Sequence, residues 1–260
     1  MTEHTIRNGA VTTGAAPSGA TDAQSAATAV QSMFNAIAPR YDLLNHLLSA
    51  NIDRLWWNRT ARRFRTTLQN PDAAVLDICC GTGDMTMALL KHRPADSRPV
   101  LAADFAHQML ARGAEKFSRP STRRGTAVAL EADALHLPLP DRSLDLITTA
   151  FGFRNLANYR EGLAEFQRVL KPGGQLGILD FSEPDGVIGK VYQIYFRRVL
   201  PAIGRLICGK DGPYNYLPAS VHRFPPPPEM QTMMREAGFK NVTWTPYTFG
   251  IAGLYVGVRS

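Results

Sequence analysis

The residues best suited to chemistry lie between Val75 and Asp84. An apolar run carries Asp77 and leads into the glycine turn Gly81-Thr82-Gly83, after which apolar residues recur at helical spacing. Glycine lets a backbone approach a ligand closely and adopt positive φ, and the first N–H groups of the following helix lack partners within it. The stretch therefore predicts a strand, a tight turn and a helix start that bind a nucleotide at the carboxyl edge of an open sheet. A G-x-G pattern by itself also occurs in ordinary strand-to-helix turns.

A second acid, Asp104, ends the next apolar run. It stands about 20 residues past the turn, where a carboxylate can bind the two hydroxyls of a ribose. Two cofactor classes contain such a ribose. A dinucleotide pyrophosphate requires a third glycine in the pattern G-x-G-x-x-G, and Thr86 occupies that position. The missing glycine favours S-adenosyl-L-methionine, which has no pyrophosphate.

The segment Glu131-Ala132-Asp133-Ala134 follows the third apolar run. Asp133 can accept hydrogen bonds from an adenine amino group, while Ala134 and other apolar neighbours flank the ring. The competing interpretation is that Asp133 caps a helix. The residues expected to bind the cofactor are Asp77, Gly81, Thr82, Gly83, Asp104, Asp133 and Ala134.

Apolar runs and helical patterns alternate from residue 73 onward. The runs cover 73–79, 99–104, 126–130, 144–149 and 174–180, and two more, 241–247 and 253–258, close the chain as a hairpin-like pair. The clearest helix is 156–171, whose end is marked by Lys171-Pro172-Gly173-Gly174. Strands that alternate with helices form a parallel sheet covered on both faces. We therefore expect an α/β fold with a doubly wound, mostly parallel seven-stranded sheet and an antiparallel last strand.

Length, charge and cysteine content restrict the class of protein. The chain has 260 residues, a formal net charge of +7 and three cysteines, two of them adjacent. One large domain is favoured over two, and neither a disulfide framework nor a metal site is expected. We see no basic start followed by an apolar core and no apolar run long enough to span a bilayer. These features predict a cytoplasmic enzyme, and the charge also fits an anionic membrane surface or nucleic acid.

The remaining segments are expected to surround the site. Residues 1–28, rich in Ala, Thr, Ser and Gly, are predicted to form a disordered tail, and 29–260 the catalytic domain. Within that domain, 30–68 should form a helical lid and 184–228 a substrate cover, because a long connection between core strands usually carries function. The apolar helix 187–200 in the cover, with its basic residues, either lies at a membrane surface or packs on the sheet.

Taken together, Asp77-x-x-x-Gly81-Thr82-Gly83, Asp104 and Asp133 resemble the cofactor motifs of class I S-adenosylmethionine-dependent methyltransferases. Within that superfamily the chain is similar to the ubiquinone/menaquinone biosynthesis C-methyltransferases from about residue 31 to the end. The matching blocks include Tyr41-Asp42-Leu43-Leu44-Asn45, Phe151-Gly152-Phe153-Arg154-Asn155, Arg168 to Gly174, Tyr216-Leu217-Pro218 and His222-Arg223-Phe224-Pro225. Where that family usually has Glu, this chain has Asp180.

The resemblance implies that a demethylated, prenylated quinol is methylated on a ring carbon, with demethylmenaquinol preferred and a ubiquinone-pathway benzoquinol as the alternative. A free phenol has a pKa of about 10, so the ring needs help to ionise at neutral pH. By the same resemblance, Arg154 would stabilise the phenolate, Asn155 would orient it, and Tyr41 in the lid would hydrogen-bond the ring oxygens. His222 could accept a proton, although a single histidine more often has a structural role.

Other classes remain as alternatives. An NAD-dependent oxidoreductase would need the third glycine and a Tyr-x-x-x-Lys pair, and no tyrosine in this chain has a lysine four residues on. A nucleic-acid methyltransferase would need an Asn/Asp-Pro-Pro-aromatic turn or a Pro-Cys nucleophile where Phe151 to Asn155 stand. A non-catalytic module would bind the methyl donor without turnover. The expected partners are the quinol and, transiently, the inner face of a membrane; a homodimer is left open, and no nucleic acid is expected.

Overall fold

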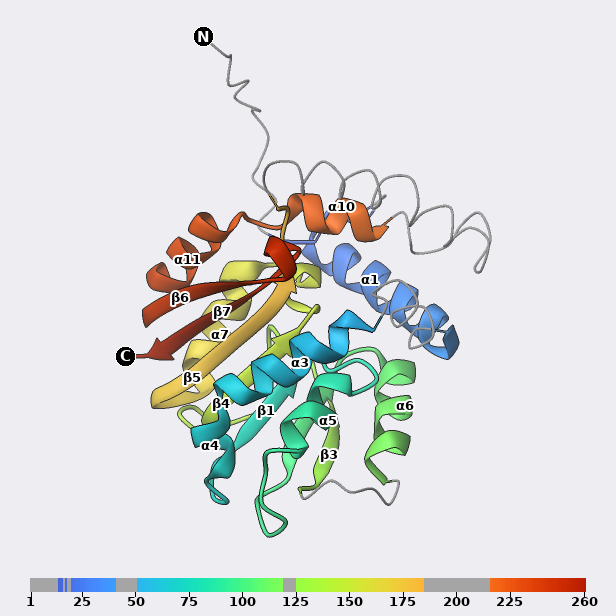
Figure 1. Ribbon diagram of the computed structural model, residues 1–260. Helices are drawn as coiled ribbons and strands as arrows, with labels where there is room; N and C mark the ends of the chain where they lie inside the picture. The colour runs from blue at the N-terminus through green and yellow to red at the C-terminus, as the bar shows by residue number, and fades with distance from the viewer. Residues whose placement is uncertain (1–13, 16, 18–19, 41–50, 119–124, 185–215) are drawn as a thin grey trace.

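The computed structural model describes residues 14–15, 17, 20–40, 51–118, 125–184 and 216–260 (Figure 1). The helices there are α1 (Ala23–Ile37), η1 (Ala38–Arg40), α3 (Ile52–Arg63), α4 (Arg65–Gln69), α5 (Asp84–Leu90), α6 (His107–Ser118), η2 (Phe153–Asn155), α7 (Tyr159–Val169), α10 (Tyr216–Arg223), α11 (Pro227–Glu236) and η5 (Thr248–Gly250). The strands are β1 (Val75–Ile78), β2 (Val100–Asp104), β3 (Ala127–Glu131), β4 (Leu144–Ala150), β5 (Leu170–Phe181), β6 (Phe239–Tyr247) and β7 (Ala252–Arg259). Within these ranges we find no helix with the length and apolar content needed to cross a membrane.

One seven-stranded sheet forms the centre of the molecule, in the order β3-β2-β1-β4-β5-β7-β6. The neighbours from β3 to β5 run parallel, whereas β7 is antiparallel to both β5 and β6. Strand order reverses between β1 and β4, since β2 and β3 lie on one side of β1 and the later strands on the other. The predicted α/β fold with an antiparallel last strand is therefore confirmed, and a ligand is expected at the carboxyl edge beside this reversal.

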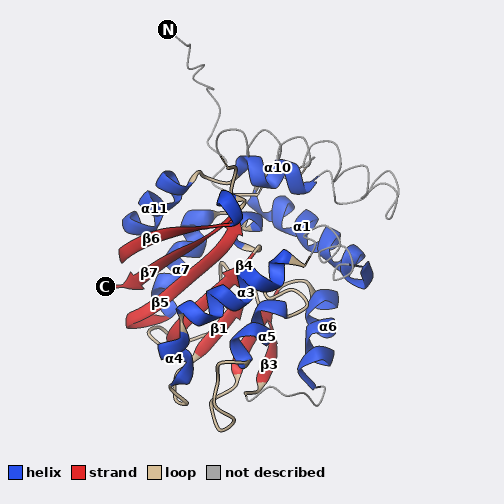
Figure 2. Ribbon diagram, in the orientation of Figure 1, coloured by secondary structure: helices blue, strands red, loops and turns tan. Residues whose placement is uncertain are grey.

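Helices cover both faces of the sheet (Figure 2). Side chains of α3, α4 and α5 pack with Val75 and Leu146 in one apolar cluster. Side chains of α7 and α11 pack with Leu76 and Ile147 in the cluster on the other face. This explains why all four residues of β1 are buried and why its sequence is a continuous apolar run interrupted only by Asp77.

The N-terminal helix begins earlier than expected. The tail was predicted to extend to residue 28, but α1 starts at Ala23. Asp22 caps it, because its side chain accepts from the Ser25 N–H at 2.7 Å while the Ser25 hydroxyl accepts from the Asp22 N–H at 3.1 Å. The alanines that made this segment look disordered are strong helix formers, and Ala26 is buried.

The boundary between α7 and β5 also differs from the prediction. The helix ends at Val169, two residues before the predicted end, and β5 already begins at Leu170, which pairs with Leu144. A register irregularity follows, and pairing resumes at Gln175. Proline disfavours a helical conformation in the residue before it, and Gly173 has a φ of 81°. The Pro-Gly-Gly sequence therefore forms a bulge inside the strand instead of the connection between helix and strand.

Candidate active site

A cleft of about 950 Å³, its open mouth included, lies at the carboxyl edge of the sheet. The segments that follow β1, β2, β3 and β4 all contribute to its wall, through residues such as Gly81, Asp104, Asp133 and Gly152. Ala27 and Phe34 of α1 and Trp57 of α3 close it from above. The cleft therefore joins the nucleotide-binding turn to the Phe151–Asn155 block in one space.

The glycine turn after β1 has the conformation that its sequence predicts. Gly81 and Gly83 have φ angles of 55° and 85°, and Gly83 begins α5. A Cβ on Gly83 would lie 2.4 Å from the Phe117 ring, and the positive φ would strain any other residue, so glycine is favoured at this position. Thr82, also predicted, lines the cleft, and its hydroxyl accepts from Lys116 Nζ at 3.1 Å. The sequence did not predict that Lys116 binds this turn, because Lys116 lies in α6, 34 residues away from Thr82.

Asp104 lies in the cleft wall at the end of β2, as predicted. Its two carboxylate oxygens accept the N–H groups of Gly81 at 2.7 Å and Ala106 at 2.8 Å. Each oxygen keeps capacity for a second hydrogen bond, so the carboxylate can also receive a sugar hydroxyl. Burial raises the pKa of Asp104 to about 6, against the opposing effect of these N–H donors.

Asp77 does not line the cleft, in contrast to the prediction that it binds the cofactor directly. It is fully buried, and its oxygens accept the hydroxyls of Thr86 at 2.6 Å and Thr148 at 2.9 Å. Desolvation raises its pKa to about 7. Asp77 therefore joins β1 to α5 and β4 below the turn.

Asp133 and Ala134 both line the cleft. The Asp133 carboxylate accepts from the Leu135 N–H at 2.9 Å in a short turn between β3 and β4, and no helix begins there, so the interpretation of Asp133 as a helix cap is wrong. Its other oxygen lies 3.5 Å from Nδ1 of the exposed His136. Apolar residues that were not predicted from the sequence also line the cleft, among them Phe105, Met109 and Leu135. A flat aromatic base fits between such walls, with a carboxylate at its edge.

Arg154 belongs to the Phe151–Asn155 block, but it is buried and is absent from the cleft wall. Its Nη1 forms an ion pair with Asp180 Oδ1 at 2.8 Å, and its backbone N–H binds Asp180 Oδ2 at 3.1 Å. The guanidinium also donates to the Phe151 carbonyl. The sequence did not predict this pairing, because Asp180 lies in β5, 26 residues further along the chain. The charge of Arg154 is thus engaged in holding the block onto β5.

Asn155, in contrast, lines the cleft. Its side-chain oxygen accepts from the Tyr216 hydroxyl at 3.2 Å, and its amide nitrogen donates to the Phe151 carbonyl at 3.4 Å. A primary amide has two N–H groups. The second one can therefore donate to an oxygen of a molecule in the cleft.

Two predicted candidates, Tyr41 and His222, complete the comparison with the prediction. Tyr41 lies outside the described residues, as does the apolar helix 187–200. The side chain of His222 is 71% exposed, and its Nδ1 lies 3.2 Å from Glu183 Oε1. His222 is not part of the cleft wall, so a role as proton acceptor is not supported.

Comparison with known proteins points to one family. Residues 21–259 match the model of the ubiE/COQ5 methyltransferase family. The chain is 45% identical to demethylmenaquinone methyltransferase of Deinococcus radiodurans over 91% of this chain and 95% of that protein. It is 47% identical to the protein of the same name from Thermus thermophilus, over 87% of this chain and 100% of the relative. It is 40% identical to the ubiquinone/menaquinone biosynthesis C-methyltransferase UbiE of Geobacter sulfurreducens, over 88% of each chain.

Solved structures show the same fold at low sequence identity. A SAM-dependent methyltransferase from Thermotoga maritima, described as a possible histamine N-methyltransferase, aligns with a TM-score of 0.60 at 16% identity and covers 89% of this chain and 100% of its own. The trans-methyltransferase CalH in complex with SAH aligns with a TM-score of 0.53 at 17% identity, covering 80% of this chain and 55% of its own. These similarities extend to the fold and do not indicate the acceptor.

Proposed function

Because the chain belongs to the ubiE/COQ5 methyltransferase family, and is therefore an S-adenosyl-L-methionine-dependent methyltransferase, we propose that its acceptor is a prenylated demethylated quinol, namely demethylmenaquinol, methylated on a ring carbon. The observation that carries the proposal is that Asn155 lies in the same cleft as Gly81, Asp104 and Asp133. A methyl donor and an acceptor ring would share this one cleft. The names of the Deinococcus and Thermus relatives support a naphthoquinol over a benzoquinol.

The residues present fit S-adenosyl-L-methionine, which supplies an activated methyl group on a sulfonium. Asp104 would receive the ribose hydroxyls with the capacity that Gly81 and Ala106 leave open. Asp133 would accept the adenine amino group, with Ala134 beside the ring. The glycine turn would let the backbone approach the rest of the donor, and Asp77 would hold that turn in place from below. Aligning donor and acceptor while excluding water supplies most of the rate in such a transfer.

At the acceptor end, Asn155 would donate its second amide N–H to the phenolate oxygen and so favour the ionised ring. Arg154 would act indirectly, because its ion pair with Asp180 fixes the block that carries Asn155. Tyr216 would fix the orientation of the Asn155 amide through its hydroxyl. We keep for Tyr41 the role that the family resemblance implies, a hydrogen bond to the ring oxygens.

The proposed reaction can be tested in a host that lacks its own enzyme. When this protein is supplied, extracted demethylmenaquinone should fall and a quinone heavier by one CH₂ should replace it, as read by mass spectrometry. The purified protein should also transfer labelled methyl from S-adenosyl-L-methionine to a short-tailed, water-soluble demethylnaphthoquinol. Methylation of a benzoquinol alone would identify the alternative substrate. Binding of the methyl donor with turnover of neither quinol would contradict the proposal and favour a non-catalytic module.

The isoprenoid tail of this substrate would bring the protein to the cytoplasmic face of a membrane, in a peripheral and reversible contact. The sequence-based assignment of that contact to helix 187–200 concerns residues that the structure does not describe. A homodimer likewise stays a prediction, which the mass from light scattering in solution would check.

A further inference from the structure

Helix α3 presents an unusual outward face. At 3.6 residues per turn, its buried residues Asp53, Trp56, Trp57, Thr60 and Ala61 form one continuous side. The opposite side is exposed and carries Arg54, Leu55, Arg59, Arg62 and Arg63. Leu55 lies in the middle of this exposed arc, between the positions of Arg59 and Arg62, with 67% of its surface accessible.

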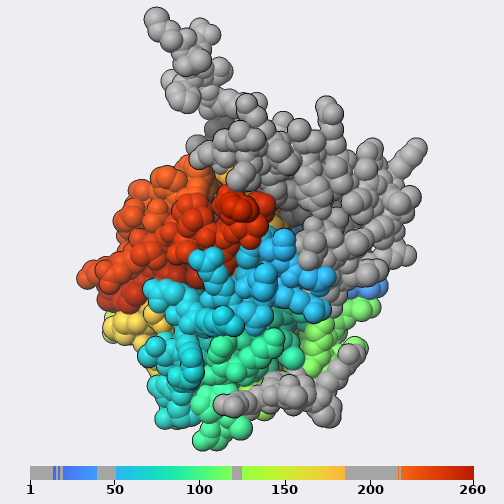
Figure 3. Space-filling view, viewed as in Figure 1, coloured from blue at the N-terminus to red at the C-terminus, as the bar shows by residue number. Residues whose placement is uncertain are grey.

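A second exposed apolar side chain lies beside this helix. Phe249 in η5 is 77% accessible and has a φ of 58°, a left-handed conformation that is rare for aromatic residues. The two elements are joined, since Trp56 Nε1 donates to Thr248 Oγ1 at 2.8 Å. Figure 3 views this side of the molecule and shows the red atoms of η5 directly above the blue and cyan atoms of α3. We call the exposed residues of α3 together with Phe249 the α3–η5 face.

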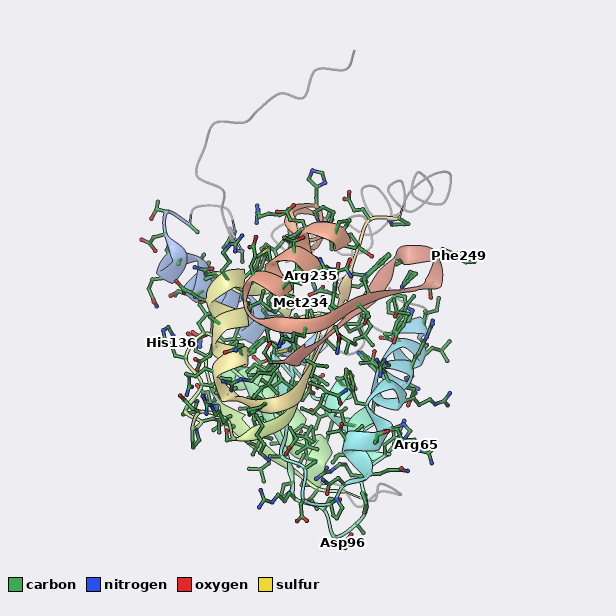
Figure 4. All side chains as sticks on the ribbon, turned by 90° about the vertical axis from the view of Figure 1, so that its left-hand side faces the viewer. Arg65, Asp96, His136, Met234, Arg235 and Phe249 are labelled. Atoms are coloured by element: carbon green, nitrogen blue, oxygen red, sulfur yellow. The ribbon has the colours of Figure 1, made fainter. Side chains whose placement is uncertain are left out.

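The α3–η5 face is strongly basic. The acid in α3, Asp53, is buried, and α4 contributes Arg65 without any acid. The charges of these arginines reach a neighbouring histidine. The pKa of His92 is lowered first by its partial burial and then by the positive charges of Arg65 and Arg62. Figure 4 shows Phe249 and Arg65 on the same side of the molecule.

We propose that the α3–η5 face docks on an anionic lipid membrane, with Leu55 and Phe249 entering the acyl boundary and the arginines contacting the headgroups. Basic residues around apolar side chains are the arrangement that binds such a surface. A nucleic acid would satisfy the arginines but would leave both apolar side chains in water. The inference rests on the proposed function, because an isoprenoid tail gives the protein a reason to visit a membrane. The face also adjoins the cleft, since Trp57 of α3 lines it and Trp56 packs against Phe151 at 5.8 Å between ring centroids.

The test uses the full chain and three double variants. Leu55→Ser with Phe249→Asn removes the apolar contacts, and asparagine tolerates the left-handed backbone of position 249. Arg54→Gln with Arg62→Gln removes two charges from the face. The matched control, Arg160→Gln with Arg235→Gln, removes two exposed charges from α7 and α11, which cover the opposite face of the sheet. Figure 4 shows Arg235 pointing to a different side from Phe249.

The wild type and the control should float with vesicles of phosphatidylcholine and phosphatidylglycerol at low salt, and less so at high salt. The charge variant should partition about 25-fold less, because each Lys or Arg near an anionic membrane contributes about fivefold. The apolar variant should lose about tenfold or more. Both variants should lose turnover of a long-tailed quinol embedded in vesicles and keep turnover of a short-tailed, water-soluble one.

Equal partitioning of all four proteins would overturn the inference, and so would wild type that binds duplex DNA but no vesicles. These outcomes are separable from failure of the proposed function. If the wild type methylates the short-tailed quinol but does not bind vesicles, only the membrane inference is wrong. If it methylates no quinol, the proposed function is wrong whatever the vesicles show.

Discussion

Asp77 and Asp104 each lie in an apolar strand, yet they have different surroundings. Asp104 borders the cleft, whereas Asp77 is enclosed by the hydroxyls of Thr86 and Thr148. The sequence predicted both acids as ligands of the cofactor, and it could not distinguish them. The difference depends on the direction of each side chain relative to residues on other strands, and Thr148 is 71 positions away from Asp77.

Replacing Asp104 with Asn should weaken binding of S-adenosyl-L-methionine by about ten- to hundredfold, because a hydrogen bond to a charged group contributes about 1.5–3 kcal/mol. Isothermal titration calorimetry would measure the dissociation constant. The substitution Glu131→Gln, at an exposed carboxylate paired with His107, serves as a control that should bind normally. Unchanged affinity of Asp104→Asn would mean that the ribose lies elsewhere.

Replacing Arg154 with Ala should lower the unfolding free energy by about 3–5 kcal/mol, because it leaves the Asp180 carboxylate buried without its partner. The double variant Arg154→Ala with Asp180→Ala should recover part of that loss but none of the turnover, since the block carrying Asn155 is no longer held. In both proteins, and in Asn155→Ala, kcat should fall far more than the affinity for the methyl donor. An Arg154 variant with weaker donor binding and normal kcat would contradict this role.

At the scale of elements, the segment after β1 and the segment after β4 approach each other closely in the wall of the cleft. Gly152, in the block after β4, lies against Cys79, the residue that leaves β1, and a Cβ on Gly152 would lie 2.3 Å from the Cys79 Cβ. Cys79 itself has a φ of 55°, which glycine would adopt more easily. The segment that leads into the glycine turn and the Phe151–Asn155 block are therefore positioned against each other.

The substitution Gly152→Ala should destabilise the protein by about 1–3 kcal/mol through overpacking and should weaken binding of the methyl donor. Adding Cys79→Gly removes the opposing Cβ and should restore both properties at least in part. Thermal unfolding and calorimetry on the single and double variants measure the coupling. If the two effects are simply additive, the contact does not couple the two segments.

The elements themselves could largely be predicted, because strand and helix periodicities are local signals. All seven expected strands are present, and the main helix between β4 and β5 was located to within a few residues. The errors occur where contacts between distant residues determine where an element begins or ends. Leu170 joins β5 because it pairs with Leu144, and α1 extends to Ala23 because Ala26 has a surface to pack on. The Arg154–Asp180 pair was invisible for the same reason.

At the scale of the whole molecule, stability should depend on pH through the buried acid below the cleft. The folded pKa of Asp77 is about 7 against an ordinary value of 3.8. Below pH 3.8 both the folded and the unfolded chain keep this proton. As the pH rises toward 7, the unfolded chain releases it first, so the unfolding free energy decreases, by up to about 4 kcal/mol from this group. The raised pKa of Asp104 acts in the same direction.

Urea unfolding of the wild type and of Asp77→Asn between pH 4 and pH 8 would test this. The amide stays neutral throughout, so the stability of the variant relative to the wild type should increase with pH. Asp72→Asn, at an exposed acid, provides the control, whose stability should follow that of the wild type. Parallel curves for Asp77→Asn and the wild type would show that the buried carboxyl does not titrate in this range.

The position of β7 has a consequence for how the protein is made. This strand is the last of those that the structure describes, yet it lies inside the sheet, between β5 and β6. Strand β6 is synthesised earlier and pairs within this sheet with β7 alone, so the sheet cannot be completed before Ala252–Arg259 has been made. A premature stop codon within Ala252–Arg259 would therefore do more than shorten the chain, because it would leave two unpaired strand edges exposed to self-association.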